Sequence, residues 1–209
     1  MQRIAIVEDC LRARYSFFRW RYNAALANKI ILAFGMACAA GLLAQVKVPL
    51  PWTPVPITGQ TFVALLAGVI LGRWWGGISL GVYVAMGVAG VPWFAGWNGG
   101  YNAIIGPTGG YIIGFVLAAL FLGYFTDKYV GARNFISLLF LMLFANFVLI
   151  HIPGLLQLAI WFRVVKGVPP SFWELLLIGT VPFIVGDIVK IVAAAASAYV
   201  ITPKEHFCK

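Results

Sequence analysis

The sequence predicts an all-α integral membrane protein folded as a bundle of six transmembrane helices. Only 10% of its 209 residues are charged and 62% are hydrophobic, whereas soluble domains carry about 25% charged residues. The mean hydropathy is +0.94. Apolar runs also recur along the chain at lengths that suit membrane-crossing helices, which need about 20 residues, or fewer where a helix is short or tilted.

Six such runs cover residues 27–46, 59–72, 74–91, 108–126, 134–162 and 172–201. The second is short and the last two are long, so we expect tilt or extension beyond the bilayer. Together they predict one membrane domain, residues 27–201, between an N-terminal segment 1–26 and a C-terminal tail 202–209. The N-terminal segment is rich in arginine and aromatic residues and lacks the features of a signal peptide. Two interpretations remain open for it, a helix lying at the membrane interface and a partly disordered tail.

The basic residues predict the orientation. Six spans place both termini on one side of the membrane. If that side is the cytoplasm, the inner segments hold eleven of the fifteen Lys and Arg residues, the outer segments hold three, and Lys190 lies within a span. Cytoplasmic segments of membrane proteins carry such an excess, so we expect a multi-pass protein with both termini in the cytoplasm. The net charge of +9 is then explained by the anionic membrane surface and does not indicate nucleic acid.

The last apolar run contains the charged side chains Asp187 and Lys190. Three residues apart on a helix, they share one face, and charges at membrane depth are costly and mark functional sites. One interpretation is a structural ion pair. The other is a ligand site, in which the carboxylate accepts N–H groups and the ammonium holds an anionic group. No metal-ligand spacing or nucleophile elbow occurs, so no catalytic residue, metal or cofactor is assigned.

Two uncharged segments are candidates for the rest of the site. Residues 48–58 hold four prolines, which predict a stiff, extended outer loop that acts as a lid or only as a connector. Residues 91–107 are too broken by Gly and Pro to be a helix, and irregular backbone at membrane depth is tolerated where it lines a cavity; its aromatic residues alone would fit an interfacial belt. The implied ligand is a small amphiphilic acid. The candidate lining residues are Thr58, Trp93, Phe94, Asn98 and Asn102 from these segments, and Tyr111 from the Gly-rich start of the fourth run.

Two further features have alternative interpretations. Ala33, Ala37 and Gly41 form a stripe of small residues, along which another helix, of this chain or of a partner, can approach closely. His151 lies near the middle of the fifth run, next but one to Pro153. We interpret it as part of a hydrogen-bonded kink rather than as a proton relay.

Three motifs resemble the signatures of the BioY family, the biotin-binding S components of energy-coupling factor (ECF) transporters. They are Pro-Val-Pro-Ile-Thr-Gly-Gln-Thr at 54–61, Gly-Pro-Thr-Gly-Gly-Tyr-Ile-Ile-Gly-Phe at 106–115, and Gly-Asp-Ile-Val-Lys at 186–190. The resemblance covers about residues 27–200. The arginine-rich N-terminal segment is not recognised as part of the family pattern.

The resemblance implies a six-helix S component in the plasma membrane of a prokaryote. It would capture biotin outside the cell and release it inward after docking to a transmembrane coupling subunit that two ATPase subunits drive. The chain itself would then be no enzyme, and biotin would be its transported ligand rather than a cofactor. Alternatives are an S component for another small vitamin, and a stand-alone ion-coupled carrier in which Asp187 and His151 relay protons.

The resemblance also implies roles for individual residues. Asp187 would bind the ureido N–H groups of biotin and Lys190 would help to hold the polar ends of the ligand. An asparagine would join them, Asn102 in preference to Asn98. The stripe of Ala33, Ala37 and Gly41 would meet the coupling subunit.

Overall fold

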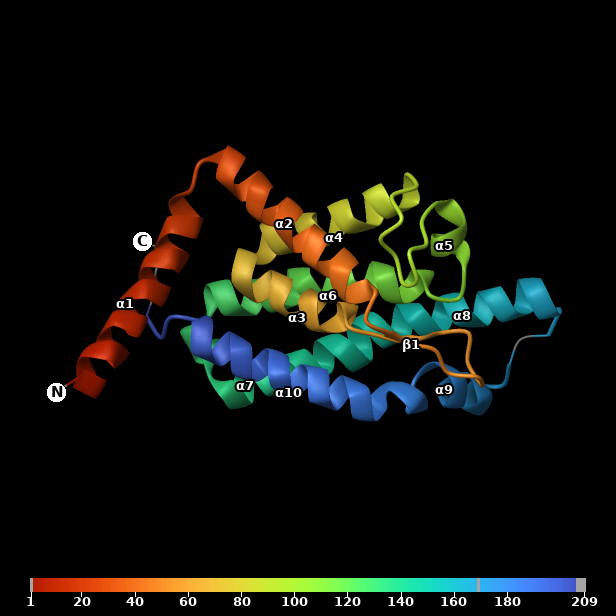
Figure 1. Cartoon of the computed structure of the whole chain (residues 1–209). Helices are drawn as coiled ribbons and strands as arrows, with labels where there is room; N and C mark the ends of the chain where they lie inside the picture. The colour runs from red at the N-terminus through yellow and green to blue at the C-terminus, as the bar shows by residue number, and fades with distance from the viewer. Residues whose placement is uncertain (1, 169, 206–209) are drawn as a thin grey trace.

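The computed structural model describes residues 2–168 and 170–205, with side chains from residue 12 onward except that of Lys166, and it is mostly helical (Figure 1). A two-stranded antiparallel hairpin pairs Lys47 with Thr58 and Val48 with Ile57. The elements in chain order are α1 (Gln2–Asn23), α2 (Leu26–Ala44), β1 (Lys47–Val48), β2 (Ile57–Thr58), α3 (Gln60–Leu71), α4 (Arg73–Val88), α5 (Tyr101–Ile105), α6 (Gly109–Lys128), η1 (Val130–Arg133), α7 (Phe135–Phe144), η2 (Ala145–Ile150), α8 (His151–Lys166), α9 (Phe172–Gly179), η3 (Val181–Phe183) and α10 (Ile184–Ile201).

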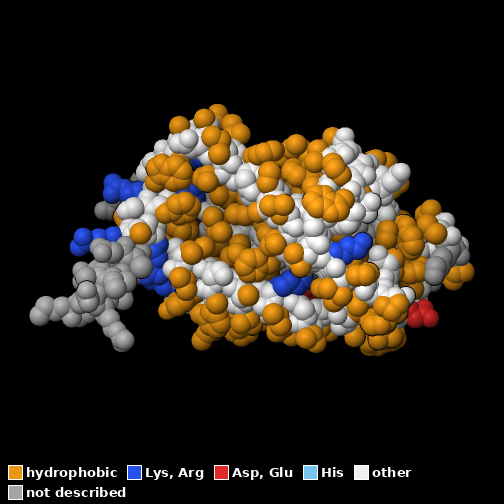
Figure 2. Space-filling view, in the orientation of Figure 1, with side chains coloured by type: hydrophobic (Ala, Val, Ile, Leu, Met, Phe, Trp, Pro, Cys, Tyr) orange, Lys and Arg blue, Asp and Glu red, His pale blue; other side chains and the backbone are white. Residues whose placement is uncertain are grey.

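Helix α6 lies at the centre of the bundle, where it packs against α3, α4 and α8. Large apolar side chains are fully buried at these contacts, such as Leu122 of α6, Leu65 of α3 and Leu80 of α4. Hydrophobic side chains also cover the middle of the outer surface (Figure 2). A soluble monomer rarely exposes apolar patches of this extent, so this exterior fits the lipid environment that the composition predicts.

Within the described residues, four helical stretches are long and apolar enough to cross a membrane, by length and composition: Leu26–Ala44, Gly109–Lys128, Phe135–Val165 and Phe172–Ile201. The prediction of a helical membrane protein is therefore confirmed. Helix α3 has 12 residues and α4 has 16, which at 1.5 Å per residue gives about 18 and 24 Å, less than the hydrocarbon core of about 30 Å. The count of six spans and the side on which the termini lie stay predictions.

Three expectations need correction in detail. The fifth run is not a regular α-helix, because the π-helix η2 separates α7 from α8. The sixth run is broken at Thr180, and η3 has Pro182 at its start, where the missing N–H of proline interrupts α-helical bonding. Residues 91–107 were expected to contain no helix, yet they include the short helix α5.

Glycines on α6 bring α8 unusually close. A Cβ atom added at Gly110 would clash with the carbonyl oxygen of Pro153, and one added at Gly114 would lie 2.6 Å from the Cα atom of Ile150. The two glycines are four residues apart and so share one face of α6. They allow the backbones to meet as small residues do in membrane helix pairs, and this close packing places His151 beside the centre of the bundle.

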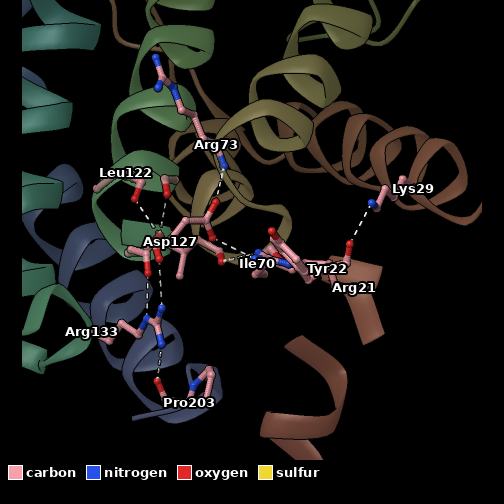
Figure 3. Close-up of polar contacts among 12 residues, drawn as sticks. Arg21, Tyr22, Lys29, Ile70, Arg73, Leu122, Asp127, Arg133 and Pro203 are labelled. Carbon is pink, nitrogen blue, oxygen red and sulfur yellow. Dashed lines mark hydrogen bonds and ion pairs between the residues drawn. The ribbon is translucent and has the colours of Figure 1, made fainter. Parts of the chain in front are cut away.

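Basic side chains gather at the end of the bundle where α3, α6 and α10 finish (Figures 2 and 3). Arg21 of α1 donates to the carbonyl oxygen of Ile70 and to Asp127, both at 2.9 Å. Arg133 is 1% exposed and donates to the carbonyl oxygens of Thr126 and Pro203 at 2.8 and 3.1 Å. Because the last carbonyls of a helix have no partner within it and carry partial negative charge, these cations stabilise the helix ends.

The N-terminal segment, for which a helix and a disordered tail were both open, is helical from Gln2 to Asn23. Its position at a membrane interface stays a prediction. Residue Met1 and residues 206–209 of the expected tail lie outside the described residues, and with them Lys209, which contributed to the orientation prediction.

Candidate functional site

A cavity of about 410 Å³ opens at the end of the bundle remote from α1. It lies between the Pro-rich hairpin, the segment that follows α4, and helices α6, α8 and α10. Its volume falls within the range of small-molecule sites, about 300–1,000 Å³. The described residues that line it include most of the predicted ones: Thr58, Phe94, Asn98, Asn102, Tyr111, Asp187 and Lys190.

Asp187 is the centre of the polar wall of this cavity, although it is only 2% exposed. Its Oδ1 atom lies 2.6 Å from the ammonium of Lys190. Its Oδ2 atom lies 2.9 Å from His151 Nε2 and accepts a hydrogen bond from the side-chain amide of Asn146 at 3.0 Å. A buried carboxylate is tolerated only with such partners. The two oxygens are therefore held by groups from different parts of the chain.

The π-helix η2 explains how Asn146 and His151 reach the same carboxylate. The two residues are five positions apart, which on a regular α-helix turns their side chains about 140° away from each other. A π-helical turn contains one residue more, with i to i+5 hydrogen bonds, so a separation of five residues brings the side chains back to one face. The Asn146 side chain is fully buried, and its Oδ1 atom has no hydrogen-bond partner among the described residues.

The break between α9 and α10 is anchored to the same wall. Tyr111 donates its hydroxyl proton to the carbonyl oxygen of Gly179 at 2.7 Å, an oxygen that the broken helix leaves without its usual partner. His151 Nδ1 lies 3.2 Å from the hydroxyl of Thr180. The irregular backbone of this region is therefore satisfied inside the protein, as it must be at membrane depth.

Lys190 connects the ion pair to the Pro-rich hairpin. Besides its contact with Asp187, its ammonium donates to the carbonyl oxygen of Thr58 at 3.2 Å. Thr58 in turn donates from its hydroxyl to Gln60 Oε1 at 3.2 Å. The hairpin thus covers the cavity beside the two charges, which agrees with a lid more closely than with a remote connector.

One predicted lining residue lies elsewhere. Trp93 is buried behind the described cavity wall, where its indole N–H donates to the carbonyl oxygen of Tyr83 at 2.9 Å. Its side chain also packs against α2, because a Cβ atom added at Gly41 would lie 3.0 Å from the Cβ atom of Trp93. Trp93 holds the loop to the helices, while its neighbour Phe94 faces the ligand space.

The interpretation of the small-residue stripe on α2 as an interface for the coupling subunit also needs correction in this conformation. Ala33 and Ala37 are 3% and 0% exposed, and α2 packs against α3 and α4. The stripe is thus used for packing within this chain, the alternative that was set aside in favour of a coupling-subunit interface. Side chains buried in this way are not accessible to a partner in this conformation.

Sequence reasoning missed Asn146 and Lys47, and it interpreted His151 as part of a kink or, in the alternative carrier, as a proton relay with Asp187, but not as a residue that positions Asp187 for a ligand. Asn146 was detectable as an amide in an otherwise apolar run, but its spacing from His151 argues against a shared site on a regular helix. Lys47 lines the cavity because the hairpin folds back, which no local pattern indicates.

Comparison with known proteins identifies the family. The model of the BioY family matches residues 15–205. The chain belongs to the BioY family. The match begins inside α1, so the family extends further toward the N-terminus than the sequence motifs indicated.

Similar proteins include two archaeal relatives. A probable biotin transporter BioY of Methanothermobacter thermautotrophicus is 54% identical over 142 residues, which cover 68% of this chain and 90% of that protein. One of Pyrococcus horikoshii is 38% identical over 178 residues, or 85% of this chain and 96% of that protein. Among solved structures, the S-component for biotin from an ECF-type ABC transporter matches with a TM-score of 0.72 at 25% identity, over 83% of this chain and 89% of that one. The helical arrangement is thus that of an ECF S component of the BioY family.

Proposed function

We propose that this protein is the substrate-binding S component of an ECF-type transporter and that its ligand is biotin. The observation that carries the proposal is the pairing of Asp187 and Lys190 in the wall of a cavity of about 410 Å³. The family match and the relatives described as biotin transporters support the choice of ligand.

The chemistry of the cavity suits biotin, which combines a ureido group, an apolar bicyclic ring and a carboxylate tail. Asp187 would accept the ureido N–H groups, since ionised acceptors make the stronger hydrogen bonds. Lys190 would shift from Thr58 or Asp187 to a polar end of the ligand. Apolar side chains such as Phe94 and Phe115 would pack against the rings, and Asn102 and Asn98 offer further hydrogen bonds from the same wall.

The proposed membrane topology of the protein follows the orientation that the basic residues predict. With six spans and both termini in the cytoplasm, the cavity opens to the outside of a prokaryotic plasma membrane and the hairpin forms its lid. Release would require the site to open inward, driven by a transmembrane coupling subunit and two ATPase subunits. The buried Ala33–Ala37 stripe is not included in the docking surface.

Calorimetry with the purified full chain tests the proposal. We expect one biotin to bind per protein, and Asp187→Asn to abolish binding while the protein stays folded. Loss of one partner in a desolvated charged contact costs about 2–5 kcal/mol. Biotin binding of wild-type strength in the variant would refute the site. Failure of the folded wild-type protein to bind biotin, together with binding of another small carboxylate, would identify an S component for a different vitamin.

A stand-alone ion-coupled carrier is the second candidate, because the 2.9 Å contact between His151 and Asp187 is also what a proton relay requires. Proteoliposomes that contain this chain alone separate the two functions. The S component predicts no biotin accumulation without the ATPase module. Uptake that follows an imposed pH gradient or membrane potential would favour the carrier.

A further inference from the structure

Helix α1 lies across the end of the bundle instead of continuing it. Arg14 donates to the carbonyl oxygen of Val200 at 2.8 Å, at the end of α10, and Arg21 reaches Asp127 at 2.9 Å, at the end of α6. The two arginines are seven residues apart, or about 10 Å along a helix, so α1 bridges the ends of two different helices. Figure 1 shows α1 set at a steep angle to α6 and α10.

This placement puts α1 at the membrane surface. Helices α6 and α10 belong to stretches long and apolar enough to cross the bilayer, so their ends lie near its boundary. A helix that runs across those ends runs along the surface. Arg14 and Arg21 bond to groups of this protein and not to lipid, so they hold α1 in this position in a membrane of any lipid composition.

The sides of α1 differ in a way that suits this location. One side packs on the bundle through Phe18 and Arg21, which are 2% and 5% exposed. A second side exposes the rings of Phe17 and Trp20, whose centroids lie 6.1 Å apart. The third side is polar and exposed, and its residues follow the i, i+4, i+7, i+11 spacing of one helix face: Arg12, Ser16, Arg19 and Asn23. The exposed aromatic side and the exposed basic side are therefore neighbours on the last turns of α1, where rings and arginines together can meet a membrane interface.

A shallow hollow of about 430 Å³ lies where the polar face meets the start of α2. Its described lining combines one guanidinium (Arg19), one hydroxyl (Ser16), two side-chain amides (Asn23 and Asn28) and the ring of Trp20, with no carboxylate among them. Guanidinium, hydroxyl and amide groups are donors suited to phosphate oxygens. The indole provides an apolar wall on the side where Phe17 is exposed.

The electrostatics of this end of the protein favour an anion. Many of the described basic side chains gather at the end where α1 lies, while a few lie toward the cavity (Figure 2). Burial, and to a smaller extent the charges of Arg14 and Arg133, holds the pKa of Lys204 below its usual range. An anionic leaflet attracts basic segments of this kind.

We propose that α1 is a membrane-surface helix and that the hollow around Arg19 binds the anionic headgroup of a phospholipid. The exposed rings of Phe17 and Trp20 then lie at the boundary of the acyl chains, while Arg19, Ser16 and Asn28 face the headgroup. A soluble phosphate would use the donors but not the adjacent apolar face, so the lipid is the occupant that accounts for both. The proposal does not depend on which ligand the cavity at the other end binds.

Native mass spectrometry of the full chain in nonionic detergent tests this, with phosphatidylglycerol and phosphatidylcholine added in parallel. We expect one phosphatidylglycerol to be retained with about fivefold preference, the effect of one basic residue near a membrane surface. Arg19→Gln should abolish the preference. Arg12→Gln is the matched control, since it removes the same charge from the same face outside the hollow, and it should keep the preference within about twofold.

Three results would overturn the proposal. Unchanged preference in Arg19→Gln would show that the hollow does not hold the headgroup. Equal losses in Arg12→Gln and Arg19→Gln would show diffuse attraction without a site. Displacement of the lipid by an equal concentration of inorganic phosphate would make the ligand a soluble anion. Equal thermal unfolding temperatures of the wild-type protein and both variants in detergent verify the fold, whichever ligand the cavity binds.

Discussion

The Nε2 atom of His151 lies 2.9 Å from the Oδ2 atom of Asp187. With Asn146 on the same oxygen and Lys190 on the other, the carboxylate is fixed from both sides before any ligand binds. A preorganised acceptor loses little conformational freedom on binding, and this raises affinity. His151 and Asn146 are thus positioning residues for Asp187 in the proposed site.

Replacing His151 tests this positioning. Because hydrogen bonds to charged groups contribute about 1.5–3 kcal/mol, His151→Leu should weaken biotin binding by about 10- to 100-fold. His151→Gln should restore most of the affinity, since its amide can still donate to Asp187. Calorimetry of the two variants measures the difference. Equal losses in two folded variants would show that the imidazole acts otherwise than as a donor.

Removal of the Lys190 ammonium should be more damaging. Lys190→Met keeps most of the side-chain volume but removes the positive charge that lies 2.6 Å from Asp187. The expected loss of biotin affinity is about 30-fold or more, corresponding to about 2–5 kcal/mol. Lys128→Met is the matched control, because it removes an equal charge at the far end of α6. Wild-type affinity in Lys190→Met would exclude this residue from the site.

The close packing of α6 and α8 predicts a strong effect of one methyl group. Gly110→Ala would force α8 away from α6, because the new Cβ atom meets the carbonyl oxygen of Pro153. We expect destabilisation of about 1–3 kcal/mol with weaker biotin binding, since α8 carries His151. Gly35→Ala is the control, because nothing lies within 4 Å of its added Cβ atom. Thermal unfolding in detergent should separate the two, and equal unfolding temperatures would contradict the packing argument.

The opposite end of the bundle should affect stability without affecting the ligand. Asp127→Ala removes the carboxylate that accepts from Arg21 and from the backbone N–H of Arg73, both at 2.9 Å. Leaving the buried Arg21 without this partner should lower stability by about 1–3 kcal/mol. The biotin dissociation constant should not change, since the cavity lies at the other end. A large loss of affinity would instead show that the two ends are coupled.

Much of this protein follows from composition and short motifs. Composition and hydropathy predict a helical membrane protein, because only 10% of the residues are charged and long apolar runs recur, whereas soluble domains carry about 25% charged residues. Asp187 and Lys190 stand out because charges in an apolar run are costly unless they are used. The proline-rich segment 48–58 and the glycine-rich segment 91–107 identify parts of the chain that line the cavity, although the second includes the short helix α5.

Only the tertiary structure decided how these parts meet. The π-turn that brings Asn146 and His151 to one carboxylate packs against α6 and is linked to α10 through Asp187, and it departs from the spacing of a regular helix. The fold also decided what packs on Ala33 and Ala37, because their small size permits close approach of a helix of this chain or of another protein. Trp93 likewise turns away from the cavity, and its indole N–H bonds to the carbonyl oxygen of Tyr83. Sequence patterns report what a segment prefers locally, whereas each of these outcomes was determined by non-local contacts between segments far apart in the chain.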